Sequence, residues 1–282
     1  MELKDLEIFK EVALQQNISK TAMKFNYVQS NITNRLLKLE KEVDCELLTR
    51  TNKGVQLTNE GKIFLEYTNK VLQLHKELQL ELHGESRIRE IKIGATDITT
   101  SSRLPTILSL FKKTYPTVDI SLQIASTKQL VQSVLQHELD GAFISSTITH
   151  PELYYEKVAD EEVVIICSKN HPPIQALTDV QHEMMLLFSK GCTYRELTES
   201  WLRDEKILMK TMELSTTESM INFVKAGLGV ALLSKHIVEQ ANHDHLLHYY
   251  SVPTKYAHAE TGFITHKNIG VAKGFIEIIR SS

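Results

Sequence analysis

The sequence predicts two kinds of folded unit, an all-α unit at the N-terminus and a larger α/β unit after it. Up to residue 83, apolar residues recur at the three- and four-residue steps of amphipathic helices. Beyond Gly84, short β-branched runs alternate with helical stretches, which is typical of parallel βαβ units. A chain of 282 residues is long enough for two or three such units.

The first informative segment predicts two short helices joined by a tight turn. Asn17 is suited to cap a helix whose inward residues are Ile18, Ala22 and Phe25. The small side chain of Ala22 permits close approach of a second helix. Asn26-Tyr27 forms the turn between them.

The second helix is predicted to have one apolar stripe and one polar face. At about 100° per residue, a single stripe contains Val28, Ile32, Leu36 and Leu39. The short hydrogen-bonding side chains that point away from this stripe are Gln29, Ser30, Thr33 and Asn34. Helix-turn-helix proteins contact base edges in the major groove with such residues at this helix start. An ordinary helical hairpin with a solvated polar face is the alternative.

The charge around this helix pair is locally positive. No acidic residue occurs from Val12 to Leu39, whereas four basic residues do: Lys20, Lys24, Arg35 and Lys38. Phosphate contacts depend on such a local field. The whole chain carries a net charge of −3, which argues against a general coat of basic residues for nucleic acid. Any DNA contact must therefore be local.

A basic hairpin at residues 49–57 favours DNA binding over the ordinary helical hairpin. Gly54 can supply the positive φ of a tight turn, and Arg50 and Lys53 flank its tip. A winged helix-turn-helix places such a wing on the DNA backbone or at the minor groove. We therefore expect a winged helix-turn-helix domain over residues 1–58.

A long helix is expected next, from Asn59, capped by Thr58, to about His83. Its apolar residues repeat at alternating steps of three and four: Phe64, Tyr67, Val71, Leu74 and Leu78, with Leu82 one turn on. This narrow seam is suited to a coiled coil with a partner helix. A helix packed on its own domain is the alternative. Residues 59–87 are thus expected to link the domains and to pair two subunits.

The α/β part divides into regular elements. The expected strands are 91–95, 118–124, 142–144, 163–167, 184–188, 208–214, 230–233, 246–252 and 262–265. The expected helices are 104–114, 130–136, 196–204, 219–226 and 271–279. The last strand and helix are expected to return to the first subdomain.

These motifs resemble the LysR-type transcriptional regulators, over essentially the whole chain. The resemblance implies a C-terminal effector domain of two α/β lobes like a periplasmic solute-binding protein. It spans residues 88–282, with lobe I at 88–161 and 266–282, lobe II at 162–265, and crossings near 161 and 265. The expected fold class is thus α/β with an N-terminal all-α winged helix-turn-helix and a long linker helix. The resemblance also implies promoter DNA as partner, a homodimer through the linker helix and a tetramer, with RNA polymerase a further candidate partner.

The resemblance assigns roles to particular residues of the N-terminal motif. Positions that match Gln29, Ser30 and Thr33 read bases or adjoining phosphates in the family. Other positions of the family motif lie close to the DNA backbone, and they match Arg35, Lys38, Arg50 and Lys53 in this chain.

Departures from the family pattern fall into two groups. Asp44 stands where a helix-ending glycine is usual and Leu48 replaces a usual phenylalanine, and both concern packing. Asn34 and Arg35 differ from the commonest pair, which bears on the preferred operator sequence.

Polar loops at the carboxyl ends of the expected strands predict a small anionic effector, a carboxylate metabolite. Hydroxyls and basic side chains gather there at helix starts, where backbone N–H groups and the helix dipole favour anions. The candidate residues are Thr99, Thr100, Ser101, Ser102, Arg103, Ser126, Thr127, Lys128, Thr193 and Thr217. Plain helix capping is the alternative for each loop.

No cofactor or metal is expected. The stretch 226–229 contains two glycines but precedes a strand, so it is interpreted as a helix-to-strand turn instead of a phosphate cradle. His243-Asp244-His245 with His248 fits no zinc spacing on a helix.

A redox-responsive regulator is an alternative that rests on Cys192. Lys190 and Arg195 stand beside this thiol in the sequence and would lower its pKa. Cys167 is the one resolving cysteine expected in the same lobe, as a buried strand residue.

Other classes find little support in the sequence. No nucleophile elbow or cofactor loop indicates an enzyme. A solute-binding protein without catalytic activity would share the two-lobed cleft, but it needs a secretion signal, and the expected N-terminus lacks one. No apolar run approaches the roughly 20 residues of a membrane span. Three widely spaced cysteines also suit a reducing cytoplasm.

Overall fold

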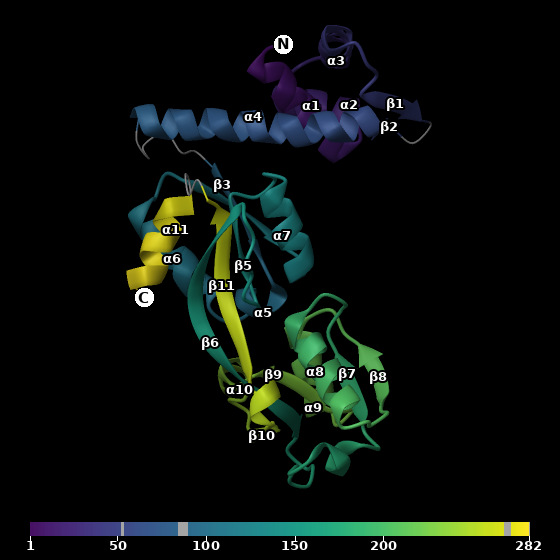
Figure 1. Ribbon diagram of the computed structural model, residues 1–282, viewed down its shortest axis with the longest axis vertical. Coiled ribbons are helices and arrows are strands. Elements are labelled where there is room, and N and C mark those ends of the chain that lie inside the picture. Colours follow the sequence, from purple (N-terminus) through teal and green to yellow (C-terminus); the bar gives the residue numbers. More distant parts are fainter. Residues whose placement is uncertain (52–53, 84–89, 268–271, 282) are drawn as a thin grey trace. The chain divides into compact units, whose positions relative to one another are not determined.

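The computed structural model describes residues 1–51, 54–83, 90–267 and 272–281, with the backbone alone at Arg50, Thr51, Leu80, Glu81 and His83. It divides into two compact units, an N-terminal helical unit and a C-terminal α/β unit (Figure 1). Each unit is described by itself.

The helical unit has four helices and a two-stranded wing. Its elements are α1 (Leu3–Gln15), α2 (Ile18–Phe25), α3 (Gln29–Val43), β1 (Leu48–Thr51), β2 (Gly54–Leu57) and α4 (Asn59–His83). Asn17 caps α2 by accepting from the Lys20 N–H, as expected. Asn26 makes the turn in the left-handed region at φ 56°. The core includes Phe9, Ala22, Ile32 and Leu39.

Gly54 is required at the wing for two reasons. Its φ of +132° is rarely adopted by residues with a side chain. A Cβ there would also lie 2.3 Å from the carbonyl oxygen of Gln16, which accepts the Val55 N–H at 3.0 Å. The wing is therefore anchored on the end of α1.

Two details of this unit, at Val28 and Phe64, differ from the sequence-based expectation. Val28 caps α3 with no side-chain hydrogen bond and is 69% exposed, so the buried stripe begins at Ile32. Phe64 packs edge-on against Phe9 at 5.1 Å, so it belongs to the helical core and not to the seam of α4. Asp44 ends α3 in the left-handed region at φ 53°, where glycine would be less strained.

The α/β unit contains the remaining elements. Its strands are β3 (Glu90–Ala95), β4 (Asp119–Ile124), β5 (Gly141–Ile144), β6 (Leu153–Ser168), β7 (Met184–Leu187), β8 (Lys210–Glu213), β9 (Ala231–Ser234), β10 (Leu247–Ser251) and β11 (His258–His266). Its helices are α5 (Asp97–Thr100), α6 (Leu104–Thr114), α7 (Thr127–Leu135), α8 (Thr193–Asp204), α9 (Thr217–Lys225), α10 (Lys235–Ala241) and α11 (Lys273–Ser281).

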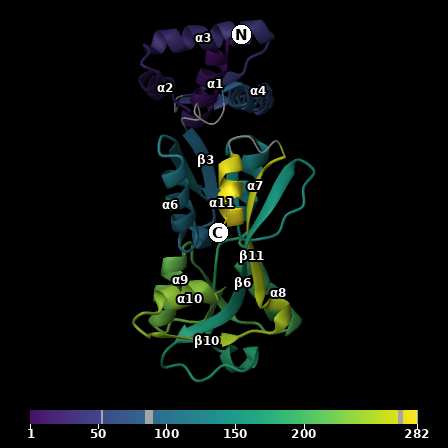
Figure 2. The ribbon, with the colours of Figure 1, turned by 90° about the vertical axis from the view of Figure 1, so that its left-hand side faces the viewer.

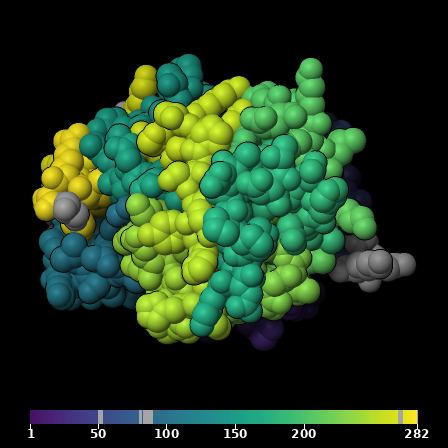
Figure 3. Space-filling view, turned by 90° about the horizontal axis from the view of Figure 1, so that it is seen from below, coloured from purple at the N-terminus to yellow at the C-terminus, as the bar shows by residue number. Residues whose placement is uncertain are grey.

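This unit forms two lobes joined by two long strands, β6 and β11 (Figures 1 and 2). In the first lobe, β3 lies between β4 and β5 as a parallel set, and β11 pairs antiparallel with both β5 and β6. In the second lobe, the far half of β6 pairs with β9 and β10, and β7 pairs with β8. The backbone N–H of Lys169 donates to the Leu246 carbonyl at 2.9 Å. The chain that follows β6 therefore lies beside the chain that enters β10, in the lobe that Figure 3 shows from below.

The second crossing lies earlier in the sequence than the expected boundary near 265, whereas the expected return of strand 262–265 to the first lobe is confirmed. Residues 262–265 already pair with β5 in the first lobe, so the chain has left the second lobe before Gly262. The physical reason is the length of β11, which pairs with β6 from His258 onward through a bulge at Thr261/Gly262.

Hydroxyl residues cap two helices of this unit, and α9 begins earlier than its apolar pattern suggests. Thr96 accepts from the Thr99 N–H and starts α5, where a loop was expected. Thr216 accepts from the Ser219 N–H and starts α9. The start of the last expected helix, at Val271, lies outside the described residues. In the described part of the chain, no helix has the length and apolar character needed to cross a membrane.

Candidate functional site

The start of α3 carries an exposed row of polar side chains. Ser30, Asn31 and Asn34 are exposed, and Thr33 is partly buried. On the opposite side of the helix, Ile32 is fully buried in the core. The expected polar face is thus on the surface of the protein, and it includes Asn31, which the sequence analysis did not single out.

Gln29 is held by a residue of the preceding helix. The Ser19 hydroxyl donates to the Gln29 Oε1 at 2.9 Å, which leaves the amide Nε2 as the outward donor. Ser19 therefore positions Gln29, a role that needs the α2–α3 geometry and has no signal in the sequence.

Arg35 makes its close contacts inside the helical unit. Its Nη1 lies 2.6 Å from Asp5 Oδ1 and 3.4 Å from Glu2 Oε2, and its guanidinium lies 5.9 Å from the centre of the Tyr27 ring. The hydrogen bond that Arg35 donates to the carboxylate of Asp5, which is 4% exposed, raises the pKa of Arg35. These contacts assign Arg35 a role in packing α1 on α3, which competes with the expected role at the DNA backbone.

The other basic residues expected near DNA differ in how closely they pair with carboxylates of the protein. Lys38 is 60% exposed, with Glu42 at 3.9 Å on the next turn. Lys24 pairs with Glu11 at 2.7 Å. The side chain of Arg50 and the whole of Lys53 lie outside the described residues.

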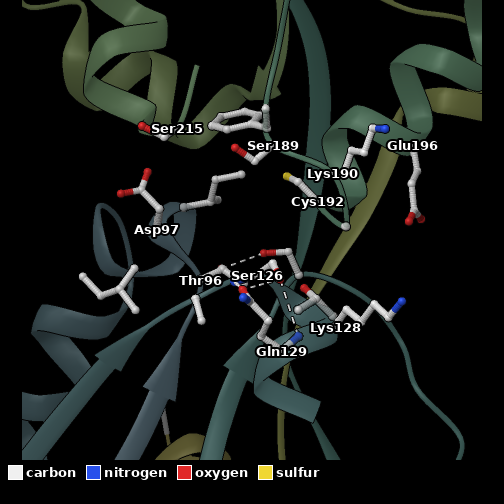
Figure 4. Close-up of a pocket in the computed structure, with 17 residues that line it drawn as sticks. Thr96, Asp97, Ser126, Lys128, Gln129, Ser189, Lys190, Cys192, Glu196 and Ser215 are labelled. Carbon is white, nitrogen blue, oxygen red and sulfur yellow. Dashed lines mark hydrogen bonds between the residues drawn. The ribbon is translucent and has the colours of Figure 1, made fainter. Parts of the chain in front are cut away.

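A second candidate site is a cavity of about 750 Å³ between the two lobes of the α/β unit. Figure 4 shows Thr96, Ser126 and Gln129 of the first lobe facing Ser189, Cys192 and Ser215 of the second. Four charged residues also line it: Asp97, Lys128, Lys190 and Glu196. The cavity therefore offers both cationic and anionic groups to a ligand, together with many hydroxyls.

Three of the ten expected effector residues line this cavity: Ser126, Thr127 and Lys128. The short helix α5 explains why four others do not. The Thr99 hydroxyl contacts Thr96 at 2.8 Å, and the hydroxyls of Thr100, Ser101 and Ser102 donate to backbone carbonyls one turn back. These hydroxyls are therefore engaged within the helix; the hydroxyl that caps α5 is that of Thr96.

The remaining three expected residues have other positions. Arg103 pairs with the buried Glu161 at 2.7 Å, and Thr193 and Thr217 lie at the starts of α8 and α9 without lining the cavity. Glu161 also accepts from Ser234 at 2.7 Å and from Thr261 at 3.4 Å. This buried network lies where β6 and β11 run from one lobe to the other.

Residues missed by the sequence analysis complete the wall. Thr96 and Ser145 follow β3 and β5 and share a hydrogen bond of 2.9 Å between their hydroxyls. Their position at the ends of neighbouring parallel strands was a usable signal. Asp97 follows Thr96 at the same strand end and shares this signal, whereas only the tertiary fold brings Gln129 and Glu196 to the cavity.

One hydrogen bond joins the lobes directly across the cleft. The Thr217 N–H, at the start of α9 in the second lobe, donates to Asp97 Oδ2 in the first lobe at 2.6 Å. A carboxylate at a helix N-terminus is stabilised by the unpaired N–H groups and by the helix dipole. Asp97 thus contributes to holding the two lobes together.

The cysteines do not have the character expected of a redox pair. Burial raises the pKa of the Cys192 thiol, contrary to the expected lowering. Arg195 instead pairs with Glu199 at 2.7 Å and Glu213 at 2.6 Å. Burial also raises the pKa of Cys167 to about 11. The redox-responsive alternative therefore loses its physical basis.

The histidine-rich segment at residues 243–248 forms an ion pair with α9 through Asp244. Asp244 accepts from Lys225 at 2.7 Å, and Lys225 also donates to the carbonyl of Ala241. Within the described ranges, no three histidine, cysteine or carboxylate side chains are grouped so that they could hold a metal ion.

Comparisons with known proteins agree across both units. Residues 3–62 match the family model "Bacterial regulatory helix-turn-helix protein, lysR family", and residues 84–282 match "LysR substrate binding domain". The HTH-type transcriptional regulator GltR of Bacillus subtilis is 38% identical over 271 residues, covering 95% of this chain and 91% of GltR.

Solved structures share the fold at low sequence identity. A full-length OxyR variant from Pseudomonas aeruginosa has a TM-score of 0.78 at 18% identity, covering 99% of this chain and 95% of that one. Full-length CbnR complexed with its target DNA has a TM-score of 0.67 at 20% identity, covering 100% and 99%.

Proposed function

This chain belongs to the LysR family of DNA-binding transcriptional regulators, and from that premise we propose that α3 reads an operator while a small molecule in the interlobe cavity controls the response. The observation that carries the first part is the exposed polar start of α3, in a segment free of acidic residues from Val12 to Leu39. A solute-binding protein without a DNA-binding role would not need that surface.

Operator binding can be tested with two variants of opposite character. Ser30→Ala should reduce the preference for operator over random DNA, because Ser30 points outward from the start of α3. Lys38→Ala should weaken binding to both duplexes and flatten the salt dependence, because a phosphate contact carries no sequence information. Equal losses on both duplexes for both variants would argue against α3 as the base-reading helix.

Pairing of two subunits is proposed to use the exposed seam of α4. Five apolar residues along this helix are between 39% and 64% exposed: Tyr67, Val71, Leu74, Leu78 and Leu82. Such a stripe at heptad spacing is suited to a second copy of the same helix. A two-fold dimer implies an operator of two inverted half-sites.

The effector is proposed to be a small carboxylate. Ser126 and Lys128 stand at the start of α7, where backbone N–H groups favour an anion, and Lys190 faces them from the second lobe. The same cavity carries Asp97 and Glu196, so a ligand with an additional amine would match it better than a simple dicarboxylate. An amino acid has this combination of charges.

Calorimetry with matched pairs tests the ligand class. An amino acid should bind and its 2-oxo acid counterpart should bind more weakly, and Lys128→Ala should abolish binding of both. Ser101→Ala is the matched control, because that hydroxyl donates to the Asp97 backbone carbonyl and does not line the cavity. Absence of binding by any member of an amino-acid and organic-acid panel would count against the assignment.

A further inference from the structure

We propose that the second lobe carries a ligand site of its own, apart from the interlobe cavity, for a small neutral ring compound that bears a hydrogen-bond acceptor. The site is a cavity of about 140 Å³ lined by Trp201, which we call the indole cavity. It lies among β6, α8, the segment 174–178 and the end of β10. The inference is independent of the proposed function, because these elements all belong to one lobe.

The inner wall of the indole cavity is apolar. Ile165, Ile174, Leu177 and Trp201 line it, and each of them is a buried residue of the core of this lobe. A cavity of about 150 Å³ with apolar walls is large enough to bind benzene. The indole cavity therefore has room for one six-membered ring, which apolar contact would hold without any need for charge.

The indole N–H of Trp201 adds a requirement for an acceptor. It is buried, and no group among the described residues accepts its hydrogen. Buried tryptophan N–H groups usually have a partner, because a buried donor without one is destabilising. The indole is itself held in place by Tyr256, which stacks on it with 5.9 Å between ring centres and donates to Asp204 at 2.5 Å. A hydroxyl or carbonyl oxygen on the ligand would supply the acceptor that the protein lacks.

The rim of the indole cavity disfavours an anion. The polar residues that line it are Gln175, Thr178, Glu205 and Ser251. Among the described residues of this lining, the one charged group is the carboxylate of Glu205, which would repel a carboxylate ligand. The interlobe cavity differs, because Lys128 and Lys190 line it. The two cavities therefore favour different classes of compound.

Nuclear magnetic resonance of the full-length protein provides the first test. Trp201 is the single tryptophan of the chain, so one indole N–H cross-peak reports on this cavity. Titration with phenol should move that peak downfield, because the phenol oxygen accepts from the N–H. Toluene has a similar shape and no acceptor, so it should bind about fivefold more weakly and should not move the peak downfield.

Two variants connect these effects to the cavity, with calorimetry as the readout. Ala176→Leu should abolish phenol binding, because Ala176 lines the cavity, and the fold should be retained because this residue is exposed. Ala226→Leu is the matched control: it makes the same change at an exposed alanine of the same lobe outside the cavity, and phenol affinity should be unchanged. Trp201→Phe should remove the difference in affinity between phenol and toluene.

A variant of the interlobe cavity separates the two sites. Lys128→Ala should bind phenol as the native protein does, because Lys128 lines the interlobe cavity and not the indole cavity. Loss of phenol binding in Lys128→Ala but not in Ala176→Leu would assign phenol to the interlobe cavity and overturn the inference. An indole peak that phenol leaves in place, or equal affinities for phenol and toluene, would overturn it as well. None of these results would bear on operator binding by α3.

Discussion

Replacing Arg35 by alanine should destabilise the helical unit and leave the salt dependence of DNA binding unchanged. The change removes the cation that lies 2.6 Å from Asp5, a carboxylate that is 4% exposed. Asp5 keeps the Glu2 N–H, at 3.0 Å, as its remaining partner. A buried carboxylate that has lost its cation is costly, because water cannot replace the lost charge.

The magnitude lies between two limits. Breaking a fully buried ion pair costs about 3–5 kcal/mol. An exposed pair contributes roughly 1 kcal/mol or less, because solvent screens it. Arg35 itself is 30% exposed, so we expect a loss of about 2 kcal/mol. A double-mutant cycle with Asp5→Ala should assign most of that loss to the coupling between the two side chains.

The assay combines urea denaturation, followed by helix circular dichroism, with operator binding at several salt concentrations. Lys38→Ala is the control in both experiments. It should leave the free energy of unfolding nearly unchanged and should reduce the slope of log K against log salt by about 0.9, the value for one phosphate contact. If Arg35→Ala behaved like Lys38→Ala, Arg35 would be a phosphate contact and the reasoning from Asp5 would be refuted.

Three further predictions follow from the same geometry. Asp97→Ala removes the hydrogen bond from the Thr217 N–H, a charge-assisted bond of the kind that contributes about 1.5–3 kcal/mol. The distribution of distances between spin labels on the two lobes should therefore widen. An unchanged distribution would show that this bond does not hold the lobes together. Leu74→Asp, in the exposed seam, should shift the dimer to monomer in sedimentation, whereas Lys62→Ala, an exposed position off the seam, should not; a dimer that survives Leu74→Asp pairs elsewhere. Burial raises the pKa of Cys167 from 9.0 to about 11, and its side chain is fully buried, so it should be alkylated much more slowly at pH 8 than an ordinary exposed thiol; rapid labelling at pH 8 in the folded protein would contradict this.

The parts of the fold set by local physics could be predicted from the sequence. Asn17 caps α2 through its own side chain, and the hairpin turn at Gly54 follows from a backbone conformation that favours glycine. Alternation of strands and helices was likewise sufficient to expect parallel βαβ units, whereas the division into two lobes came from the family resemblance. Each of these depends on residues close together in the chain.

What could not be predicted depends on residues far apart. The partner of Arg35 is Asp5, thirty positions away, and no pattern around residue 35 points to it. The hydroxyls of Thr100, Ser101 and Ser102 suggest a ligand site in a loop, but a short helix turns them to its own carbonyls. The cavity wall instead takes Asp97 from one lobe and Glu196 from the other.

Competition binding measures most directly whether the outward edge of α3 recognises sequence. The full-length protein and an Asn31→Ala/Asn34→Ala variant would each be titrated against one selected duplex and a random duplex at the same salt concentration. We predict that the native protein prefers the selected duplex by about 1,000-fold or more. The variant should lose most of that preference while its affinity for random DNA is unchanged. An equal preference in both proteins would contradict the assignment of sequence recognition to this edge.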